Sequence, residues 1–273
     1  MRAFSLILAL AFFFSACQSG SSEQAADSTT ENTESTTEET PQEEANKYTL
    51  TPFEASQEFA DASIESMDYK EGKFSFGIGG ASYELGAQTP DAEAKNCANS
   101  GKGQHIHLIV DNAPYAAKYT ADFEYDIADG EHYLLAFLSR SYHESIKTSA
   151  AHVAQQIKVS NKAIEGAEDV TSPMLFYSRP KGTYTGEKDT KKVMLDFYLS
   201  NVELGDEYKV KAEINGEEHL IDTWQPYYIE GLPIGDNTVT LTLIDKDGNA
   251  VDAPLNPVSR TFKLQEAEPA PSN

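Results

Sequence analysis

The feature that most constrains the fold is a series of short segments in which apolar and polar residues alternate. A period of two is typical of β-strands, because successive side chains point to opposite faces of a sheet. Asn215-Gly216 has the sequence preferred in two-residue hairpin turns, and no segment shows helical periodicity over three turns. The sequence therefore predicts an all-β protein. The alternating segments are KFSFGI, HIHLIVDN, HYLLAFL, VMLDFYL, YKVKAEING and NTVTLTLIDKDGN.

These segments occur twice along the chain in the same order. The matching pairs are 72–86 with 191–205, 105–112 with 209–216, and 129–143 with 235–248. A tandem repeat of sequential hairpins with this spacing is typical of immunoglobulin-like (Ig-like) sandwiches. We therefore predict two tandem Ig-like antiparallel β-sandwiches, at residues 48–165 and 166–265, and a polar tail at 266–273.

The N-terminus has the pattern of a bacterial lipoprotein signal. Arg2 is followed by an apolar run and by the sequence Phe-Ser-Ala-Cys, which ends at Cys17. The apolar run is too short to remain as a membrane-spanning helix. We predict a signal peptide at 1–16 and an acylated Cys17, which would place the protein in the cell envelope, anchored by lipid to the outer membrane. The alternative is an ordinary secreted protein in which Cys17 is incidental.

An acidic tether is expected to follow the anchor, over residues 17–47. Residues 21–47 carry eight carboxylates against Lys47 and contain no aromatic or branched aliphatic residue. Such a segment cannot bury enough apolar surface to offset its ordering entropy, so we predict that it is disordered. The net charge of −23 argues against nucleic acid as a partner.

The two repeats differ on the face of the sheet that points away from the core. Alignment of the repeats predicts that Ile106, Leu108 and Val110 point inward, because they match Val210, Ala212 and Ile214. His105 and His107 match Lys209 and Lys211, which are expected to face water. Three further outward positions are aromatic or aliphatic in the first repeat and threonine in the second: Tyr133, Leu135 and Phe137 against Thr238, Thr240 and Thr242.

An apolar outer face must be covered by something. The first repeat also carries an insertion, residues 87–104, where the second has only three residues. One interpretation is that this loop folds over the outer face and buries it, with Cys97 as a small apolar plug. The other is that the loop and the face together form a site for a small ligand or an envelope protein.

Histidines in the first repeat are candidate metal ligands. His105 and His107 stand at positions i and i+2 of a strand, so their rings project side by side. Cys97 lies on the loop that leads into this strand, while His132 and His143 flank a neighbouring strand. Imidazoles with a thiol suit copper or zinc. The alternative is a pair of ordinary, half-exposed histidines.

The segment from Gly103 to Asp111, together with Gly130-Glu131-His132, resembles small envelope β-sandwich domains with a Gly-x-His-x-His-Leu-x-Val-Asp core. Chains of this layout are similar to uncharacterised lipoproteins of Gram-negative bacteria, some of which are named phosphopeptide-binding protein. The resemblance covers roughly residues 60–265 and implies no established activity.

The name phosphopeptide-binding protein suggests a second candidate site. Residues 139–143, Ser-Arg-Ser-Tyr-His, resemble the Ser-Arg-x-His segment with which forkhead-associated domains bind phosphothreonine, although one extra residue precedes His143. Ser139 and Arg140 are therefore the candidate phosphate ligands. No motif of a known catalytic class is present in the sequence. The sequence thus favours a non-catalytic binding or structural module that binds a metal ion, with phosphate recognition or a purely structural role as alternatives.

Overall fold

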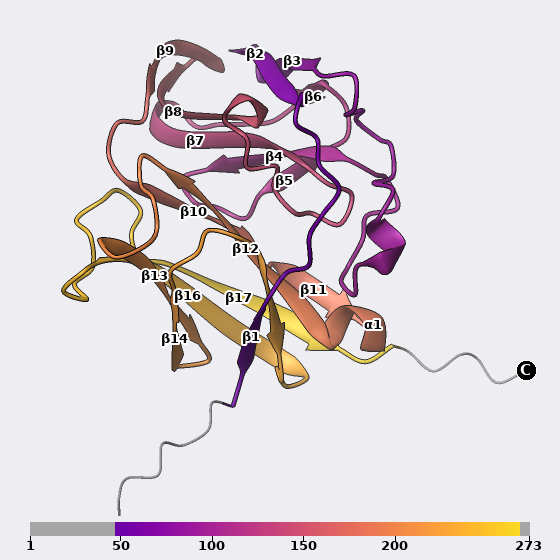
Figure 1. Ribbon diagram of the computed structural model, residues 1–273. Coiled ribbons are helices and arrows are strands. Elements are labelled where there is room, and N and C mark those ends of the chain that lie inside the picture. Colours follow the sequence, from indigo (N-terminus) through magenta and orange to yellow (C-terminus); the bar gives the residue numbers. More distant parts are fainter. Residues whose placement is uncertain (1–46, 268–273) are drawn as a thin grey trace, which may run out of the picture. The chain divides into compact units, whose positions relative to one another are not determined.

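The computed structural model describes residues 47–267 (Figure 1). The predicted signal peptide, the acylation of Cys17, the tether up to residue 46 and most of the polar tail lie outside the described residues. Within residues 47–267, no helix combines the length and the apolar character that crossing a membrane requires. The structure is built from β-sheets whose strands pair antiparallel with one exception, as the alternating sequence predicts.

The first sandwich consists of a three-stranded and a five-stranded sheet. The three-stranded sheet has the order β2-β3-β6, and the five-stranded sheet the order β5-β4-β7-β8-β9. Alternating apolar side chains of both sheets meet in one core, which includes Phe74, Ile106 and Leu134. The elements are β2 (Ser63–Lys70), β3 (Lys73–Gly79), η1 (Ala92–Ala94), β4 (His105–Val110), β5 (Ala116–Lys118), β6 (Asp122–Glu124), β7 (Gly130–Ser139), η2 (Ser149–Ala151), β8 (His152–Ser160) and β9 (Ala163–Asp169).

The second sandwich consists of a four-stranded sheet, β1-β15-β12-β10, and a five-stranded sheet, β11-β17-β16-β13-β14. All its strand pairs are antiparallel except β11 with β17. Its core includes Leu195, Phe197 and Leu241. The elements are β1 (Thr49–Pro52), β10 (Met174–Arg179), β11 (Gly182–Thr185), α1 (Glu187–Thr190), β12 (Lys192–Ser200), β13 (Tyr208–Ile214), β14 (Glu217–Ile221), β15 (Tyr227–Glu230), β16 (Gly235–Asp245) and β17 (Val258–Gln265).

The strands distribute between the sandwiches differently from the predicted boundary at 165/166. That position falls inside β9, which pairs with β8 of the first sandwich. β1, which the sequence assigns to the first sandwich, instead pairs with β15 of the second, with Leu50 opposite Ile229. The second sandwich therefore takes its edge strand from the N-terminal side of the first.

Equivalent turns occur at equivalent places in the two sandwiches. Asp111 and Asn215 directly follow β4 and β13 and have positive φ angles of 50° and 49°. The Oδ1 atom of Asp111 accepts a hydrogen bond from the backbone N–H of Tyr133 at 2.8 Å, and Oδ1 of Asn215 accepts one from Thr238 at 2.8 Å. This correspondence matches the alignment of the two repeats that the sequence suggests.

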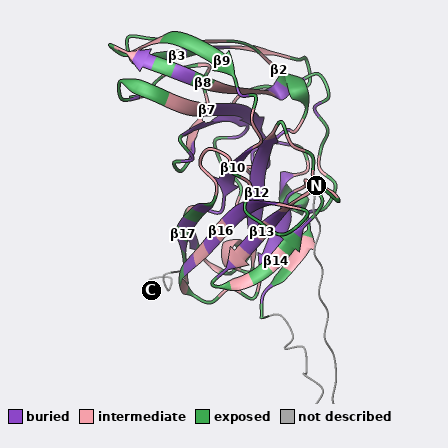
Figure 2. Cartoon of the chain, turned by 90° about the vertical axis from the view of Figure 1, so that its left-hand side faces the viewer, coloured by how far each residue is buried: buried purple, intermediate pink, exposed green. Residues whose placement is uncertain are grey.

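The outer face of β4 and β7 is covered by the second sandwich. Ile109, Leu135 and Phe137 pack there against side chains of β10 and β12. The rings of Phe137 and Tyr198 lie 5.4 Å apart and nearly parallel, at 21°. All six residues of β10 are buried, and Figure 2 shows buried residues on β7, β10 and β12. The interpretation that the 87–104 loop folds over this face and buries it is therefore wrong, because the residues packed on Ile109, Leu135 and Phe137 come from β10 and β12 of the second sandwich.

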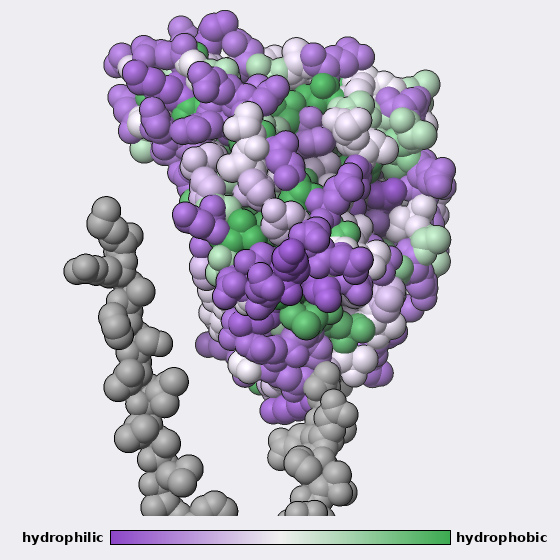
Figure 3. All heavy atoms as spheres, turned by 60° about the vertical axis from the view of Figure 1, so that its left-hand side comes forward, coloured by the Kyte–Doolittle hydropathy of each residue, from purple (hydrophilic) through white to green (hydrophobic). Residues whose placement is uncertain are grey.

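The 87–104 loop packs beside this contact. Its buried residues Ala92 and Cys97 lie in a small cluster with Tyr142 of the first sandwich and Met194 of β12. Among the described residues, the large hydrophobic side chains that remain exposed are Leu220 and Ile234. On the face drawn in Figure 3, hydrophilic residues predominate and apolar ones form separate patches. The outer face of the first sandwich is thus an internal surface of the folded chain.

Candidate metal site between the two sandwiches

β4 directs two histidine rings toward the second sandwich. His105 and His107 alternate with the core residue Ile106 and are fully buried. The strand starts two residues after Gly103, where φ is +85° and a Cβ would collide with the carbonyl oxygens of Gly86 and Ala87. Glycine at this position allows the 87–104 loop to return closely along the start of β4, which fixes where His105 lies.

A third histidine comes from the loop after β7. His143 has a φ of 71°, which is rare for a residue with a side chain. Its backbone N–H donates to the carbonyl oxygen of Arg140 at 2.9 Å, which closes a tight turn. This turn brings the ring of His143 over the start of β4, beside the ring of His105, with 4.7 Å between the two ring centroids.

The three rings converge on one point through one nitrogen each. Nε2 of His105 lies 2.8 Å from Nε2 of His107 and 3.0 Å from Nδ1 of His143. Two nitrogens that bind one zinc ion tetrahedrally at 2.0–2.1 Å stand about 3.3 Å apart. The two distances from Nε2 of His105 therefore need only a few tenths of an ångström of expansion to match this value, and all three nitrogens lie within 4.8 Å of one another. These are the three residues of the described chain whose potential ligand atoms gather in this way.

Neighbouring groups orient the rings for this purpose. Nδ1 of His105 lies 2.8 Å from the carbonyl oxygen of Gly103. A carbonyl oxygen can only accept a hydrogen bond, so Nδ1 carries the proton and donates it. The lone pair of Nε2 therefore points toward the other two rings. Nδ1 of His107 lies 3.3 Å from Oγ of Ser178. Ligating histidines are commonly held through the second ring nitrogen in this manner.

Burial keeps the three imidazoles neutral. It lowers the pKa of His105 to about 4, although the hydrogen bond with Gly103 acts in the opposite direction by favouring the protonated ring. Burial likewise holds the pKa values of His107 and His143 well below the ordinary value of 6.5. Arg179 and Lys181 add to each of these downward shifts by charge repulsion. At neutral pH, protons therefore do not compete for the converging nitrogens.

Aromatic rings and cations line the rest of the site. The ring of Tyr115 stacks on His107, with centroids 3.7 Å apart and planes at 9°, and its hydroxyl lies 3.3 Å from Nδ1 of His143. Lys181 lies over the ring of Tyr115, with Nζ 3.9 Å from the ring centroid. Ser178, Arg179 and Lys181 come from the end of β10 and the residues after it. The candidate site thus combines residues of both sandwiches.

The structure brings together three of the five residues predicted as metal ligands. His132 lies elsewhere, with Nδ1 2.6 Å from Oδ2 of Asp111 and Nε2 2.9 Å from the carbonyl oxygen of Ala128. Cys97 is buried in the separate cluster formed by the 87–104 loop, where burial raises its pKa to about 12. Neither residue belongs to the histidine cluster.

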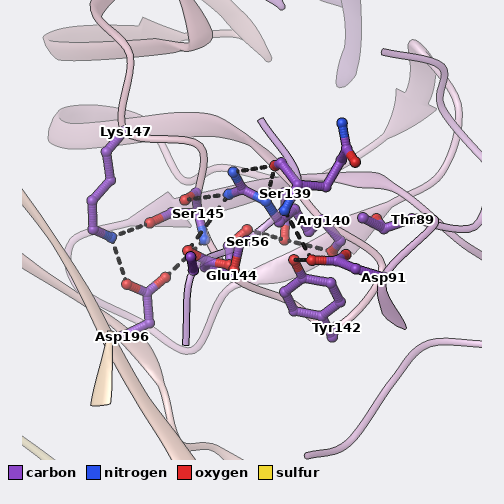
Figure 4. A network of polar contacts seen from close by, with 12 residues as sticks. Ser56, Thr89, Asp91, Ser139, Arg140, Tyr142, Glu144, Ser145, Lys147 and Asp196 are labelled. Carbon is purple, nitrogen blue, oxygen red and sulfur yellow. Dashed lines mark hydrogen bonds and ion pairs between the residues drawn. The ribbon is translucent and has the colours of Figure 1, made fainter. Parts of the chain in front are cut away.

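Ser139 and Arg140, the candidates for phosphate binding, belong to an internal polar network (Figure 4). Arg140 donates from Nε and Nη2 to the carbonyl oxygen of Gln57 at 2.9 and 2.6 Å, and from Nη1 to that of Ser145 at 3.2 Å. Its Nη1 lies 3.6 Å from the carboxylate of Glu144. Both Ser139 and Arg140 are buried. The guanidinium group therefore serves as a brace between loops, and its donors do not converge on a cavity.

The same network joins the two sandwiches. Asp196 of β12 is completely buried and accepts hydrogen bonds from the backbone N–H of Ser145 at 2.9 Å and from Nζ of Lys147 at 2.7 Å. Figure 4 shows Lys147 and Ser145 on one side of this carboxylate. The single acidic residue in the otherwise apolar strand VMLDFYL therefore has a structural partner in the first sandwich.

Sequence reasoning missed Tyr115, Ser178, Arg179 and Lys181 as neighbours of the site. One signal was available in β10, where Met174–Arg179 reads MLFYSR, a run of apolar residues on both faces. A strand that is apolar on both sides is covered on both sides. That pattern could have identified this strand as the partner of the apolar outer face of β4 and β7.

Comparisons with known proteins give distant structural likenesses. No protein-family model matches the chain, and no curated protein matches it by sequence. The fibronectin(III)-like modules of Clostridium thermocellum CbhA cover 35% of this chain and 100% of their own, at 15% identity and a TM-score of 0.26. The extracellular domain assigned to a hybrid two component system of B. thetaiotaomicron covers 77% of this chain and 39% of its own, at 11% identity and a TM-score of 0.26.

A third solved structure is a Ca²⁺-stabilised adhesin with which an Antarctic bacterium binds ice. It covers 72% of this chain and 43% of its own, at 12% identity and a TM-score of 0.21. This chain therefore spans less than half the length of the second and third of these proteins. TM-scores this low do not define the fold, which is described by the sheets and strand registers given above.

Proposed function

We propose that this protein is a non-catalytic binding module that holds one copper or zinc ion on His105, His107 and His143, between its two sandwiches. The convergence of three ring nitrogens, at 2.8 and 3.0 Å, is the observation that carries the proposal. Two of the ligands share one face of β4, and the third comes from a tight turn, so the site is organised by the fold and not by a mobile loop.

The chemistry of these side chains supports a metal ion over a purely structural histidine cluster. Three neutral imidazoles whose nitrogens lie this close repel one another through their lone pairs unless a proton or a metal ion lies between them. In the protein without metal, the short contacts require ring N–H groups of His107 or His143 to point at Nε2 of His105. A metal ion satisfies all three nitrogens at once, and imidazole is a preferred ligand of both copper and zinc.

We further propose that the protein is a lipoprotein of the cell envelope, anchored through Cys17 to the outer membrane. This proposal rests on the sequence at the N-terminus, and the protein would present its metal site to a small ligand or to another envelope protein. Incorporation of a labelled fatty acid into the wild-type chain, and its loss in Cys17→Ala, is the expected result. Labelling that persists in Cys17→Ala would contradict the anchor.

Metal analysis of the purified protein tests the proposed function. The full chain, prepared without a polyhistidine tag, is incubated with copper(I) in the absence of oxygen, or with Zn²⁺, and is then desalted. We expect one metal ion per chain, and loss of that ion in His105→Ala/His107→Ala. His132→Ala is the matched control, because His132 lies on the same sheet but outside the cluster, and it should retain the ion. Absence of metal from the folded wild-type protein would refute the function.

A further inference from the structure

The candidate ligand set carries no negative charge. The gathered ligand atoms are three histidine nitrogens, and no aspartate, glutamate or cysteine of the described chain joins them. Structural zinc sites complete a tetrahedron with a fourth ligand, and many use thiolates or carboxylates that offset the charge of the ion. The ligands therefore offset none of the charge of an ion bound to these three rings, and only charged groups in the surroundings could do so.

The surroundings supply positive charge. Within residues 47–267, neither Arg179 nor Lys181 has a carboxylate within 4.0 Å, whereas Lys147 is paired with Asp196. Arg179 is 5% exposed, and its Nε and Nη1 atoms have no hydrogen-bond partner among the described residues. Lys181 donates from Nζ to the carbonyl oxygen of Tyr115 at 2.7 Å. Two cations therefore lie buried or half-buried near the site, and neither forms an ion pair with a carboxylate of the described residues.

Both cations belong to the segment that faces the histidines. The register of β10 with β12 shifts between Tyr177 and Arg179, so that Arg179 stands opposite Asp196. Asp196 binds residues of the first sandwich, so the shift places Arg179 on the face of the sheet that meets that sandwich. Lys181 reaches the site through Tyr115, since its Nζ lies 3.9 Å from the tyrosine ring that stacks on His107.

We propose that this site selects copper(I) over zinc(II), and that Arg179 and Lys181 determine the preference. This inference rests on the proposed function, because it names the ion that the histidine site takes. Repulsion between an ion and a fixed cation is proportional to the charge of the ion, so it is twice as large for zinc(II) as for copper(I). Copper(I) also accepts three nitrogen ligands without a fourth, whereas zinc(II) seeks four. The structure therefore combines a neutral ligand set with a positive environment, and both disfavour a divalent ion relative to a monovalent one.

Competition titrations on the full-length chain test the preference. Copper(I) is titrated without oxygen against a chromophoric copper(I) chelator, and zinc(II) against a chromophoric zinc chelator, to give two dissociation constants. Lys181→Met removes one charge with little loss of packing, and we expect it to shift the ratio of the two constants toward zinc on the order of ten-fold. Arg179→Met should shift the ratio in the same direction. Lys158→Met, an exposed lysine on β8, should leave the ratio unchanged.

The outcomes separate this inference from the proposed function. If neither ion binds, the histidine site itself is refuted. If both ions bind but Lys181→Met and Arg179→Met leave the ratio at its wild-type value, the site stands and the charge-based selection is refuted. Circular dichroism shows whether Arg179→Met folds, and Lys181→Met tests the inference in either case.

Discussion

Nδ1 of His107 lies 3.3 Å from Oγ of Ser178, and this contact joins the metal-site candidate of the first sandwich to β10 of the second. The three ligands come from the first sandwich, and the residues that orient and charge the site come from both. Occupation of the site and the contact between the sandwiches are therefore coupled, and the predictions below follow from that coupling.

Metal binding should stabilise the whole folded chain. An ion that binds the folded state alone adds about 2.7 kcal/mol to the free energy of unfolding when its free concentration is 100 times Kd. We expect copper or zinc to raise the Tm of the wild-type protein and to leave that of His105→Ala/His107→Ala unchanged. Differential scanning calorimetry measures both. An equal rise in the double variant would place the metal elsewhere.

The outer face of the first sandwich should behave as core, and that of the second as surface. Leu135→Ala removes a fully buried side chain that packs against the second sandwich, at an expected cost of about 2 to 5 kcal/mol. Thr240→Ala changes the equivalent position of the second repeat, which is half-exposed, and should cost less than about 0.5 kcal/mol. Urea denaturation gives both values, and equal effects would contradict the arrangement.

The ion pair between Lys147 and Asp196 should matter more than a surface pair. Asp196 is fully buried, so Asp196→Asn leaves Lys147 without its counter-charge and should lower the free energy of unfolding by about 3 kcal/mol. Lys147→Met/Asp196→Leu removes both charges and should recover part of that loss. A double-mutant cycle of Lys147→Met, Asp196→Leu and the double variant, from chemical denaturation, measures the coupling. Additive single effects would show that the two residues do not interact.

The metal-free protein should become less stable as the pH is lowered. The folded-state pKa of His105 is held at about 4, below its ordinary value of 6.5. Between these two values the unfolded chain binds a proton that the folded chain does not, so the free energy of unfolding decreases as the pH falls through this window. The slope is at most about 1.4 kcal/mol per pH unit for each such histidine.

Denaturation in the presence of a chelator, at several pH values between 7.5 and 4.5, measures this dependence. His107→Asn and His143→Asn each remove one buried imidazole whose pKa lies well below the ordinary value. Each variant should therefore show a shallower dependence on pH than the wild type. A wild-type stability that is flat, or that rises as the pH falls, would contradict neutral burial of the cluster.

Local patterns predicted what depends on local physics. Alternation placed Ile106 and Leu108 in the core and His105 and His107 on the opposite face, because the period of a strand is two. Comparison of the two repeats identified an outer face that needed a cover. These conclusions require no knowledge of which strands meet across the molecule.

The cover itself and the neighbours of the site depend on contacts between distant segments. The sequence offered the adjacent 87–104 loop as the cover, whereas the structure uses Phe176 and Tyr198 of the second sandwich. Pairing of β1 with β15 joins residues such as Leu50 and Ile229, which are far apart in the chain. The sequence of Thr49–Pro52 does not indicate that β15 is the strand with which it pairs. Likewise, His132 could be separated from the histidine cluster only by its actual position beside Asp111.

Because β1 pairs with β15, the first sandwich is an insertion within the second. Figure 1 shows β1 among the strands of the second sandwich, apart from β2 and β3. The chain begins one domain, leaves it after Pro52 to build another, and returns at Met174. A fragment that starts in the linker near residue 172 would lack an edge strand and expose the backbone of β15. To excise the second domain intact, the segment 49–52 must be kept and rejoined to the remainder by a new connection, as in a circular permutant.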